Sequence, residues 1–342
     1  MRIAITTRLY FPLTGGVPVI ARLLGTAWSR LGHEVVLLTS TTTAEPDTDE
    51  FQVIRQPTSA DLWRAARQCD LVFQMEVSIR MLWPFTLCGK PAVVTHQTHF
   101  LEEGAPLELY RRVQHVVARF SHPVACSSVI RRSWGGHGLV IGNPYDESRF
   151  FPPAHDTSRP HELLFVGRLI SAKGIDVLLE ALARLSRENL HPRLRVIGDE
   201  KDAQGSHVPF WRQKAESLGL GAQIDFLGAK PLGEIAAEMR QARVLIVPST
   251  WQEPFGIVAL EGLACGCRVI ASSGGGLREA GGEFARYFEN GSVEGLADAI
   301  RAELTTPPPA ASTALHAHLH QHSATEVARR YLAHFETLLP LP

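Results

Sequence analysis

Short apolar runs alternate with amphipathic segments along almost the whole chain of 342 residues. Each run is long enough for one strand. Many of the segments between them repeat apolar residues every three or four positions, as a helix with one buried face does. The runs predicted as strands are residues 2–7, 33–39, 51–54, 71–74, 92–95, 124–127, 139–142, 162–166, 193–197, 224–227, 244–247 and 268–271. This alternation predicts an α/β fold in which helices cover parallel sheets.

A polar stretch with three prolines, residues 152–161, interrupts the alternation. Prolines with polar neighbours between two periodic regions are typical of a linker. A chain of this length also has room for two hydrophobic cores. We therefore predict two domains, residues 1–153 and residues 154–323, followed by a last segment, residues 324–342, that contains a helix.

The composition is that of a soluble globular protein, with 45% hydrophobic and 20% charged residues. The formal net charge of −1 argues against nucleic acid as the main partner. The chain begins directly with a strand rather than a signal segment, and no apolar run approaches the roughly 20 residues that cross a bilayer. We therefore expect a cytoplasmic protein. Its five cysteines are expected to be reduced, mostly buried thiols: Cys69, Cys88, Cys126, Cys265 and Cys267.

The segment after the strand 244–247 places two carboxylates around the start of a helix. Apolar residues recur at helical spacing from about Phe255, so that Glu253 precedes this helix and Glu261 lies about two turns inside it. The first N–H groups of a helix have no partner within it and favour an anion, and Gly256 would let a ligand approach the backbone closely. A nucleotide diphosphate sugar fits this arrangement. The alternative is a capping charge and a solvated glutamate.

A second loop between a strand and a helix carries positive charge. It reads Gly167-Arg168-Leu-Ile-Ser-Ala-Lys173-Gly174 after the strand 162–166. Arginine offers a planar fork of donors and lysine a point charge, so the loop predicts a binding site for phosphates. The alternative is a pair of surface charges.

Two loops of the first half also follow predicted strands. Gly15 and Gly16 follow the strand 2–7, at the end where open α/β sheets bind ligands, although a glycine pair taken alone favours a plain tight turn. His96 and His99 follow the strand 92–95, where a histidine could exchange a hydrogen bond with a reacting group or lie satisfied on the surface.

The motif Glu253, seven residues, Glu261, with Pro-Phe-Gly after the first glutamate, resembles the signature of the retaining glycosyltransferases of family 4, also described as glycosyl transferases group 1. The loop from Gly167 to Gly174 resembles the diphosphate loop of that family. The resemblance implies the GT-B fold: two Rossmann-like domains that face each other across a cleft. The first domain would bind the acceptor and the second the nucleotide sugar, and the last helix would cross back to the first domain.

The same resemblance implies roles for individual residues. Glu253 would hold the donor sugar and Glu261 the ribose hydroxyls, while Arg168 and Lys173 would bind the diphosphate. One of His96 and His99, with His96 preferred, would face the donor sugar. The residues implied to line the substrate site are Gly15, Gly16, Gly167, Leu227, Phe255, Gly256, Ile257 and Val258.

The resemblance implies a transferase that retains the anomeric configuration and needs neither metal nor cofactor. Its donor would be a UDP- or GDP-type sugar and its acceptor a hydroxyl group of a cell-surface glycan, lipid or secondary metabolite. The helix expected over residues 105–122 could touch the inner face of a membrane, although a plain surface helix is the alternative. A nucleotide-sugar epimerase of similar fold, or a binding protein without catalysis, are the other functions considered.

Three stretches could be taken for metal sites. Asp47-Thr48-Asp49 matches the Asp-x-Asp motif of metal-dependent glycosyltransferases of another fold, but it lies in a polar run away from the phosphate loops. Cys265 and Cys267 lack a second pair at ligand spacing. Alternating histidines in the tail are interpreted as a solvated stretch: His316, His318, His320 and His322. We predict no metal site.

Overall fold

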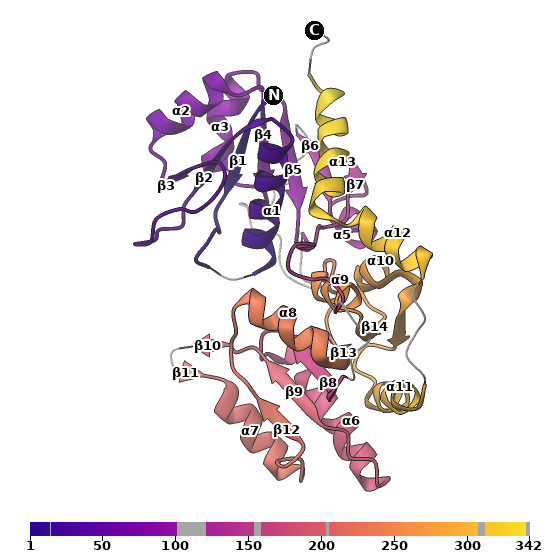
Figure 1. Ribbon diagram of the computed structural model, residues 1–342. Helices are drawn as coiled ribbons and strands as arrows, with labels where there is room; N and C mark the ends of the chain where they lie inside the picture. Colours follow the sequence, from indigo (N-terminus) through magenta and orange to yellow (C-terminus); the bar gives the residue numbers. More distant parts are fainter. Residues whose placement is uncertain (14, 101–120, 154–158, 203–204, 307–311, 340–342) are drawn as a thin grey trace. The chain divides into compact units, whose positions relative to one another are not determined.

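The structure is a computed structural model that describes all residues except 14, 101–120, 154–158, 203–204, 307–311 and 340–342 (Figure 1). The chain forms two compact units, residues 1–145 with 321–342 and residues 146–320. The change of unit at residue 146 lies before the predicted boundary at residue 153. It does so because Arg240 of the second unit donates a 3.0 Å hydrogen bond to the Arg149 carbonyl and lies over the Phe151 ring.

In the described part of the first unit, seven parallel strands form a sheet with the order β3-β2-β1-β4-β5-β6-β7. The strands are β1 (Arg2–Thr7), β2 (Glu34–Thr39), β3 (Gln52–Arg55), β4 (Leu71–Met75), β5 (Ala92–His96), β6 (His122–Ala125) and β7 (Leu139–Val140). The helices are α1 (Gly16–Arg30), α2 (Ser59–Gln68), α3 (Ile79–Leu87), α5 (Ser128–Ser133) and α13 (Ala324–Glu336). The order reverses between β1 and β4, which is where sheets of this type bind ligands, at the carboxyl ends of the strands.

Alternating residues of the central strands pack on opposite faces of this sheet. Ala4 and Val72 belong to a core with α2 and α3. On the other face Phe73 contacts Trp28 of α1 and Phe335 of α13, and the Trp28 indole donates a 3.1 Å hydrogen bond to the Ala328 carbonyl. Figure 1 shows α13, in yellow, beside α1, in indigo. The last helix is therefore an integral part of the first unit.

The second unit repeats this architecture. In its described residues, six parallel strands have the order β12-β9-β8-β13-β14-β15. They are β8 (His161–Val166), β9 (Leu194–Ile197), β12 (Ile224–Phe226), β13 (Ala242–Val247), β14 (Arg268–Ser272) and β15 (Ala285–Phe288), with a separate hairpin of β10 (Lys201–Asp202) and β11 (Gly205–Ser206). Its helices are η1 (Ser171–Lys173), α6 (Ile175–Arg187), α7 (Val208–Ser217), α8 (Leu232–Gln241), α9 (Ile257–Ala264), α10 (Leu277–Gly281), η2 (Gly282–Phe284), α11 (Val293–Thr305) and α12 (Thr313–Gln321).

One face of the second sheet packs on α6 and α11, through a core that includes Leu178, Leu182 and Ile300. The other face carries α9, whose Gly262 lies against Leu245 of β13. The predicted α/β architecture of two parallel sheets is confirmed, although β15 and the β10–β11 hairpin were not expected. The order reverses between β8 and β13, and the loops that follow these two strands carry the predicted phosphate and carboxylate residues.

Candidate functional site

The loops after β8 and β13 are bound to each other through their backbones. The N–H of Thr250 donates a 3.1 Å hydrogen bond to the Ala172 carbonyl, and the Thr250 hydroxyl donates one of 3.0 Å to the Ser171 carbonyl. These bonds hold the short helix η1, which ends at Lys173, beside the segment that leads to Glu253. Residues far apart in the sequence are thereby fixed in one place.

Lys173 and Glu253 form an ion pair at the centre of this arrangement. The Lys173 Nζ lies 2.6 Å from Oε1 of Glu253 and 5.4 Å from the centre of the Trp251 ring. The same Oε1 accepts a 2.6 Å hydrogen bond from Oγ of Ser249. Glu253 is only 5% exposed. A buried carboxylate needs hydrogen-bond donors or a cation beside it, and Lys173 and Ser249 fill this role. Lys173 is therefore the cation that neutralises the charge of Glu253.

The loop after β14 supports Glu253 from its backbone side. The N–H of Gly276 donates a 2.7 Å hydrogen bond to the Glu253 carbonyl, and that of Gly275 donates one of 2.6 Å to the side chain of Gln252. Gly275 has φ +69°, and a Cβ atom there would lie 2.1 Å from the Glu253 carbonyl oxygen. Gly275 and Gly276 are thus in close backbone contact with the segment that carries Glu253.

The start of α9 differs from the prediction by two residues. The helix begins at Ile257 rather than Phe255, and its N-cap is Gly256, with φ +96°. A Cβ atom at Gly256 would lie 2.4 Å from Leu277. Its left-handed backbone and this contact require glycine, so the expected approach of a ligand is not needed to explain it. Phe255 is buried before the helix, and helix geometry leaves the N–H groups of Ile257 and Val258 without an acceptor inside α9.

Glu261 is half-buried on α9. Burial, with a smaller contribution from the negative charge of Asp146, raises the pKa of Glu261 to about 8. Among the described residues, the structure gives this carboxyl group no hydrogen-bond donor and no cation. Hydroxyl groups of a ligand that donate hydrogen bonds to it would stabilise its charged form.

Arg168 lies on the same loop as Lys173 but is not in contact with it. Its side chain is 59% exposed, and its nearest carboxylate is that of Glu200, at 3.6 Å. The neighbouring Gly167 is fixed to β9, because its N–H donates a 3.0 Å hydrogen bond to the Ile197 carbonyl. Leu227 follows β12, half-buried, and its N–H donates a 2.9 Å hydrogen bond to the Val196 carbonyl.

The predicted residues of the first unit lie on separate loops. Gly15 caps α1 and is exposed, as is Gly16. His96 ends β5, is 2% exposed and stacks on Trp134 with 3.8 Å between the ring centres. His99 is half-buried farther along the loop. The helix expected over residues 105–122 lies almost entirely outside the described residues.

The position between the two histidines is part of a buried polar network. The side chain of Gln97 donates a 2.8 Å hydrogen bond to Thr95 and accepts one of 2.8 Å from Asn143. The Asn143 carbonyl lies 3.3 Å from Nδ1 of His322, at the entry to α13. Gln97 thus connects the end of β5 to the last part of the chain. Which of His96 and His99 faces a ligand stays a prediction.

The stretches considered as metal sites have other partners. Asp47 is 2.6 Å from Arg55 and Asp49 is 2.8 Å from Arg22. Cys265 and Cys267 are buried thiols whose pKa values burial raises to about 12. Across the described parts of the chain, no group of three or more histidine, cysteine, aspartate or glutamate side chains could hold a metal ion.

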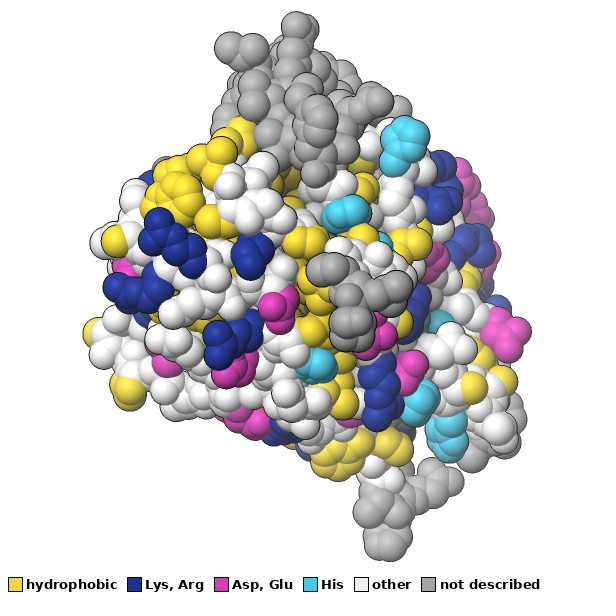
Figure 2. All heavy atoms as spheres, turned by 90° about the horizontal axis from the view of Figure 1, so that it is seen from above, with side chains coloured by type: hydrophobic (Ala, Val, Ile, Leu, Met, Phe, Trp, Pro, Cys, Tyr) yellow, Lys and Arg dark blue, Asp and Glu magenta, His cyan; other side chains and the backbone are white. Residues whose placement is uncertain are grey.

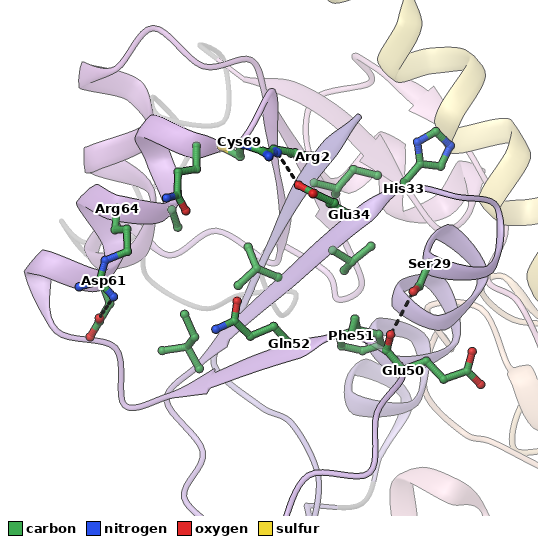
Figure 3. A pocket seen from close by; sticks show the side chains of 16 residues that line it. Arg2, Ser29, His33, Glu34, Glu50, Phe51, Gln52, Asp61, Arg64 and Cys69 are labelled. Carbon is green, nitrogen blue, oxygen red and sulfur yellow. Dashed lines mark hydrogen bonds and ion pairs between the residues drawn. The ribbon is translucent and has the colours of Figure 1, made fainter.

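The first unit contains a cavity of about 550 Å³, and none of the predicted site residues lines it (Figure 3). It is lined by residues at the amino ends of β1, β2 and β3, whereas the predicted residues lie at the carboxyl ends. Its charged side chains pair with one another, Arg2 with Glu34 and Arg64 with Asp61.

Two side chains of the site, Ser249 and Trp251, were not predicted from the sequence. Both lie between the predicted strand and Glu253, so their position in the motif was the available signal. Ser249 is 1% exposed and Trp251 37% exposed. Ser249 contacts Glu253 within its own loop, whereas Trp251 contacts Lys173 of the loop after β8.

Comparison with known proteins identifies the class. Residues 147–316 match the family model described as Glycosyl transferases group 1, and the chain belongs to this family through that part of its sequence. It is 37% identical over 140 residues to D-inositol 3-phosphate glycosyltransferase of Corynebacterium jeikeium, covering 40% of this chain and 33% of the relative. It is 33% identical over 174 residues to glycogen synthase of Mycobacterium tuberculosis, covering 50% and 41%. The chain thus spans between a third and a half of these curated relatives.

Solved structures extend the likeness to the whole chain. The Anabaena protein HepE in complex with UDP and glucose superposes with a TM-score of 0.79 and 20% identity, covering 98% of this chain and 100% of HepE. AviGT4, a glycosyltransferase involved in avilamycin A biosynthesis, superposes with a TM-score of 0.72 and 19% identity, covering 98% and 97%. At this identity the likeness shows the fold, and it confirms the predicted GT-B class of two Rossmann-like domains. No helix within the described ranges is long and apolar enough to span a membrane.

Proposed function

We propose that the protein is a glycosyltransferase that moves a sugar from a nucleotide diphosphate sugar to a hydroxyl group of an acceptor. The observation that carries this proposal is the meeting of Lys173, Glu253 and the start of α9 at the carboxyl ends of β8 and β13. This arrangement offers a cation and free N–H groups for a diphosphate, beside a carboxylate for sugar hydroxyls. The family match and the names of the curated relatives support the same reaction.

The donor is a nucleotide diphosphate sugar whose parts find separate partners. Lys173, Arg168 and the N–H groups of Ile257 and Val258 would bind the diphosphate, with Gly167 close to it. Glu261 would accept hydrogen bonds from the ribose hydroxyls, which stabilise its charged form. The backbone at Leu227 would border the base. HepE was solved with UDP and glucose, so UDP-glucose is the first donor to test.

The reaction would retain the configuration at the anomeric carbon. The bond between that carbon and the phosphate oxygen breaks, and charge on the leaving diphosphate is stabilised by Lys173, Arg168 and the start of α9. The acceptor oxygen bonds to the same face of the sugar, and its proton passes to the leaving phosphate. Glu253 positions the sugar without forming a covalent bond. The positive groups already present support a reaction that needs no metal and no cofactor.

The first unit would bind the acceptor, near Gly15, Gly16 and one of His96 and His99. We also propose a cytoplasmic location with contact to the inner face of a membrane. Described residues of α2 and α3 support that contact, because Trp83 and Leu87 are exposed close to Trp63 and Arg67. Figure 2 shows hydrophobic side chains beside Lys and Arg side chains on the left of the view from above, the side of α2 and α3 in Figure 1.

The test is nucleotide release from UDP-, GDP-, ADP- and TDP-sugars without an acceptor, with analysis of the sugar product. Slow release of nucleotide and free sugar from one donor is expected. An epimerised sugar would indicate an epimerase instead. If the protein neither released nor bound a nucleotide, both the transferase and the epimerase function would be contradicted. Arg168→Ala should weaken nucleotide binding, and unchanged affinity would remove Arg168 from the diphosphate site.

A further inference from the structure

Ser249 is a buried hydroxyl group with a charged partner. It follows Pro248 at the end of β13 and is 1% exposed. Its Oγ donates a 2.6 Å hydrogen bond to Oε1 of Glu253. A hydrogen bond to a carboxylate is roughly twice as strong as one between neutral groups. The bond therefore fixes the conformation of the Glu253 side chain more firmly than ordinary packing would.

The two donors on Oε1 of Glu253 respond differently to a ligand. Lys173 is a cation on a long chain, and 24% of its side chain is exposed, so an incoming diphosphate competes with Glu253 for it. Ser249 is neutral, short and buried, so a phosphate neither attracts nor reaches it. When Lys173 binds the diphosphate, Ser249 still donates its hydrogen bond to Oε1 of Glu253.

We propose that Ser249 is a positioning residue that holds Oε1 of Glu253 while Lys173 binds the donor diphosphate. The other oxygen, Oε2, is then left to accept a hydrogen bond from the sugar. This inference rests on the proposed transfer from a nucleotide sugar. Ser249 would orient Glu253 without contacting the ligand itself. Its loss is therefore expected to affect the binding of the sugar and not that of the nucleotide.

The first test compares Ser249→Ala with the wild-type protein, using the donor found in the panel above. We expect kcat to fall about ten- to a hundredfold, the effect of losing one hydrogen bond to a charged group. The Kd of the nucleoside diphosphate should stay within about twofold, because that ligand lacks the sugar. The control is Ser217→Ala, whose exposed hydroxyl donates a 2.7 Å hydrogen bond to the Lys214 carbonyl on α7. An unchanged kcat in Ser249→Ala would overturn the proposal.

A second test asks whether Ser249 acts through Glu253. In a Glu253→Ala background, adding Ser249→Ala should change kcat by less than about twofold, because the partner is already absent. The same large loss in both backgrounds would overturn the proposal. Ser249→Thr and Ser249→Cys serve if Ser249→Ala does not fold. Threonine keeps the hydroxyl and should retain activity, whereas the weak thiol donor should not, and equal activities would again overturn it.

The outcomes separate this inference from the proposed function. If the wild-type protein neither binds nucleotides nor cleaves any donor, the proposed function fails. If the wild-type protein cleaves a donor and Ser249→Ala cleaves it equally fast, the inference about Ser249 fails alone.

Discussion

In the second unit the loops at the strand ends are bound to one another, whereas in the first unit the predicted residues lie on separate loops. Around Glu253, three loops meet through Thr250, Gly276 and the Lys173 ion pair. In the first unit Gly15 is exposed at the start of α1, and His96 stacks on Trp134 of a different segment. The family match, residues 147–316, falls within the second unit.

This difference has a chemical reason under the proposed function. Every donor of such a transferase carries a diphosphate between a ribose and a sugar, so one arrangement of charges and N–H groups serves all of them. Acceptors share only a hydroxyl group. The donor unit is therefore expected to have a motif that can be recognised from sequence, and the acceptor unit is expected to follow its particular ligand.

The largest expected effect concerns the first unit alone. Phe335 on α13 is fully buried against Trp28 and Phe73. Phe335→Ala should destabilise the first unit by about 3–5 kcal/mol because it leaves a cavity. Urea unfolding followed by circular dichroism, together with UDP binding, is the measurement. Nucleotide affinity should be kept by the folded second unit, and a parallel loss of affinity would contradict the division of roles.

The next effect concerns the ion pair between Lys173 and Glu253 in the second unit. Lys173→Ala should lower kcat about a hundred- to a thousandfold, as the loss of a group that stabilises developing negative charge does. Steady-state kinetics with the identified donor is the measurement. Lys230→Ala is the matched control, because the Lys230 side chain is 22% exposed and makes an equally short pair, 2.6 Å, with the more exposed Glu234. Equal kcat values for both variants would show that Lys173 is only structural.

A smaller effect should distinguish two glycines with similar backbones. Gly275 has φ +69° and lies against the Glu253 carbonyl, whereas Gly291 has φ +75°, and a Cβ atom there would have no neighbour within 4 Å. Gly291→Ala should cost about 1–2 kcal/mol from its left-handed backbone. Gly275→Ala should cost more and also lower activity, since Glu253 must shift. The measurements are thermal unfolding and kcat for both variants. Equal losses of stability and of activity in the two variants would contradict this prediction.

The smallest expected effect is a proton linked to binding. Because the pKa of Glu261 is raised to about 8, its carboxyl group is mostly protonated at pH 7, and ribose hydroxyls that stabilise its charge should release that proton. Calorimetry in buffers of different ionisation enthalpy measures this release. It should disappear in Glu261→Gln, and its persistence there would assign the proton elsewhere.

The same shift has a consequence for stability. Between the ordinary glutamate pKa of 4.5 and about 8, the unfolded chain binds fewer protons than the native protein. The contribution of Glu261 to the unfolding free energy therefore decreases as the pH rises through this range. Glu261→Gln should remove that part of the pH dependence in urea unfolding.

The α/β class of the fold and most of its strands follow from the sequence alone, although β15 and the β10–β11 hairpin were not predicted. Apolar runs and helical periodicity are local properties, and so are motifs such as Glu253-Pro-Phe-Gly and Arg168 to Lys173, which lie on single loops. The start of α9 at Ile257 was displaced by two residues because the left-handed conformation of Gly256 ends the loop later than the proline suggests.

Which residues come into contact depends on the tertiary fold. Lys173 and Glu253 are 80 residues apart, and Trp28 and Ala328 are 300 apart, so no local pattern pairs them. Glycine is required at position 275 because the backbone of Glu253, in the loop after a different strand, leaves no room for a Cβ atom. Likewise, the unit boundary at residue 146 depends on Arg240, which is remote in sequence. The order of the strands in a sheet decides which loops lie side by side at its edge. Residues on those loops can contact one another only after the sheet and its packing have formed.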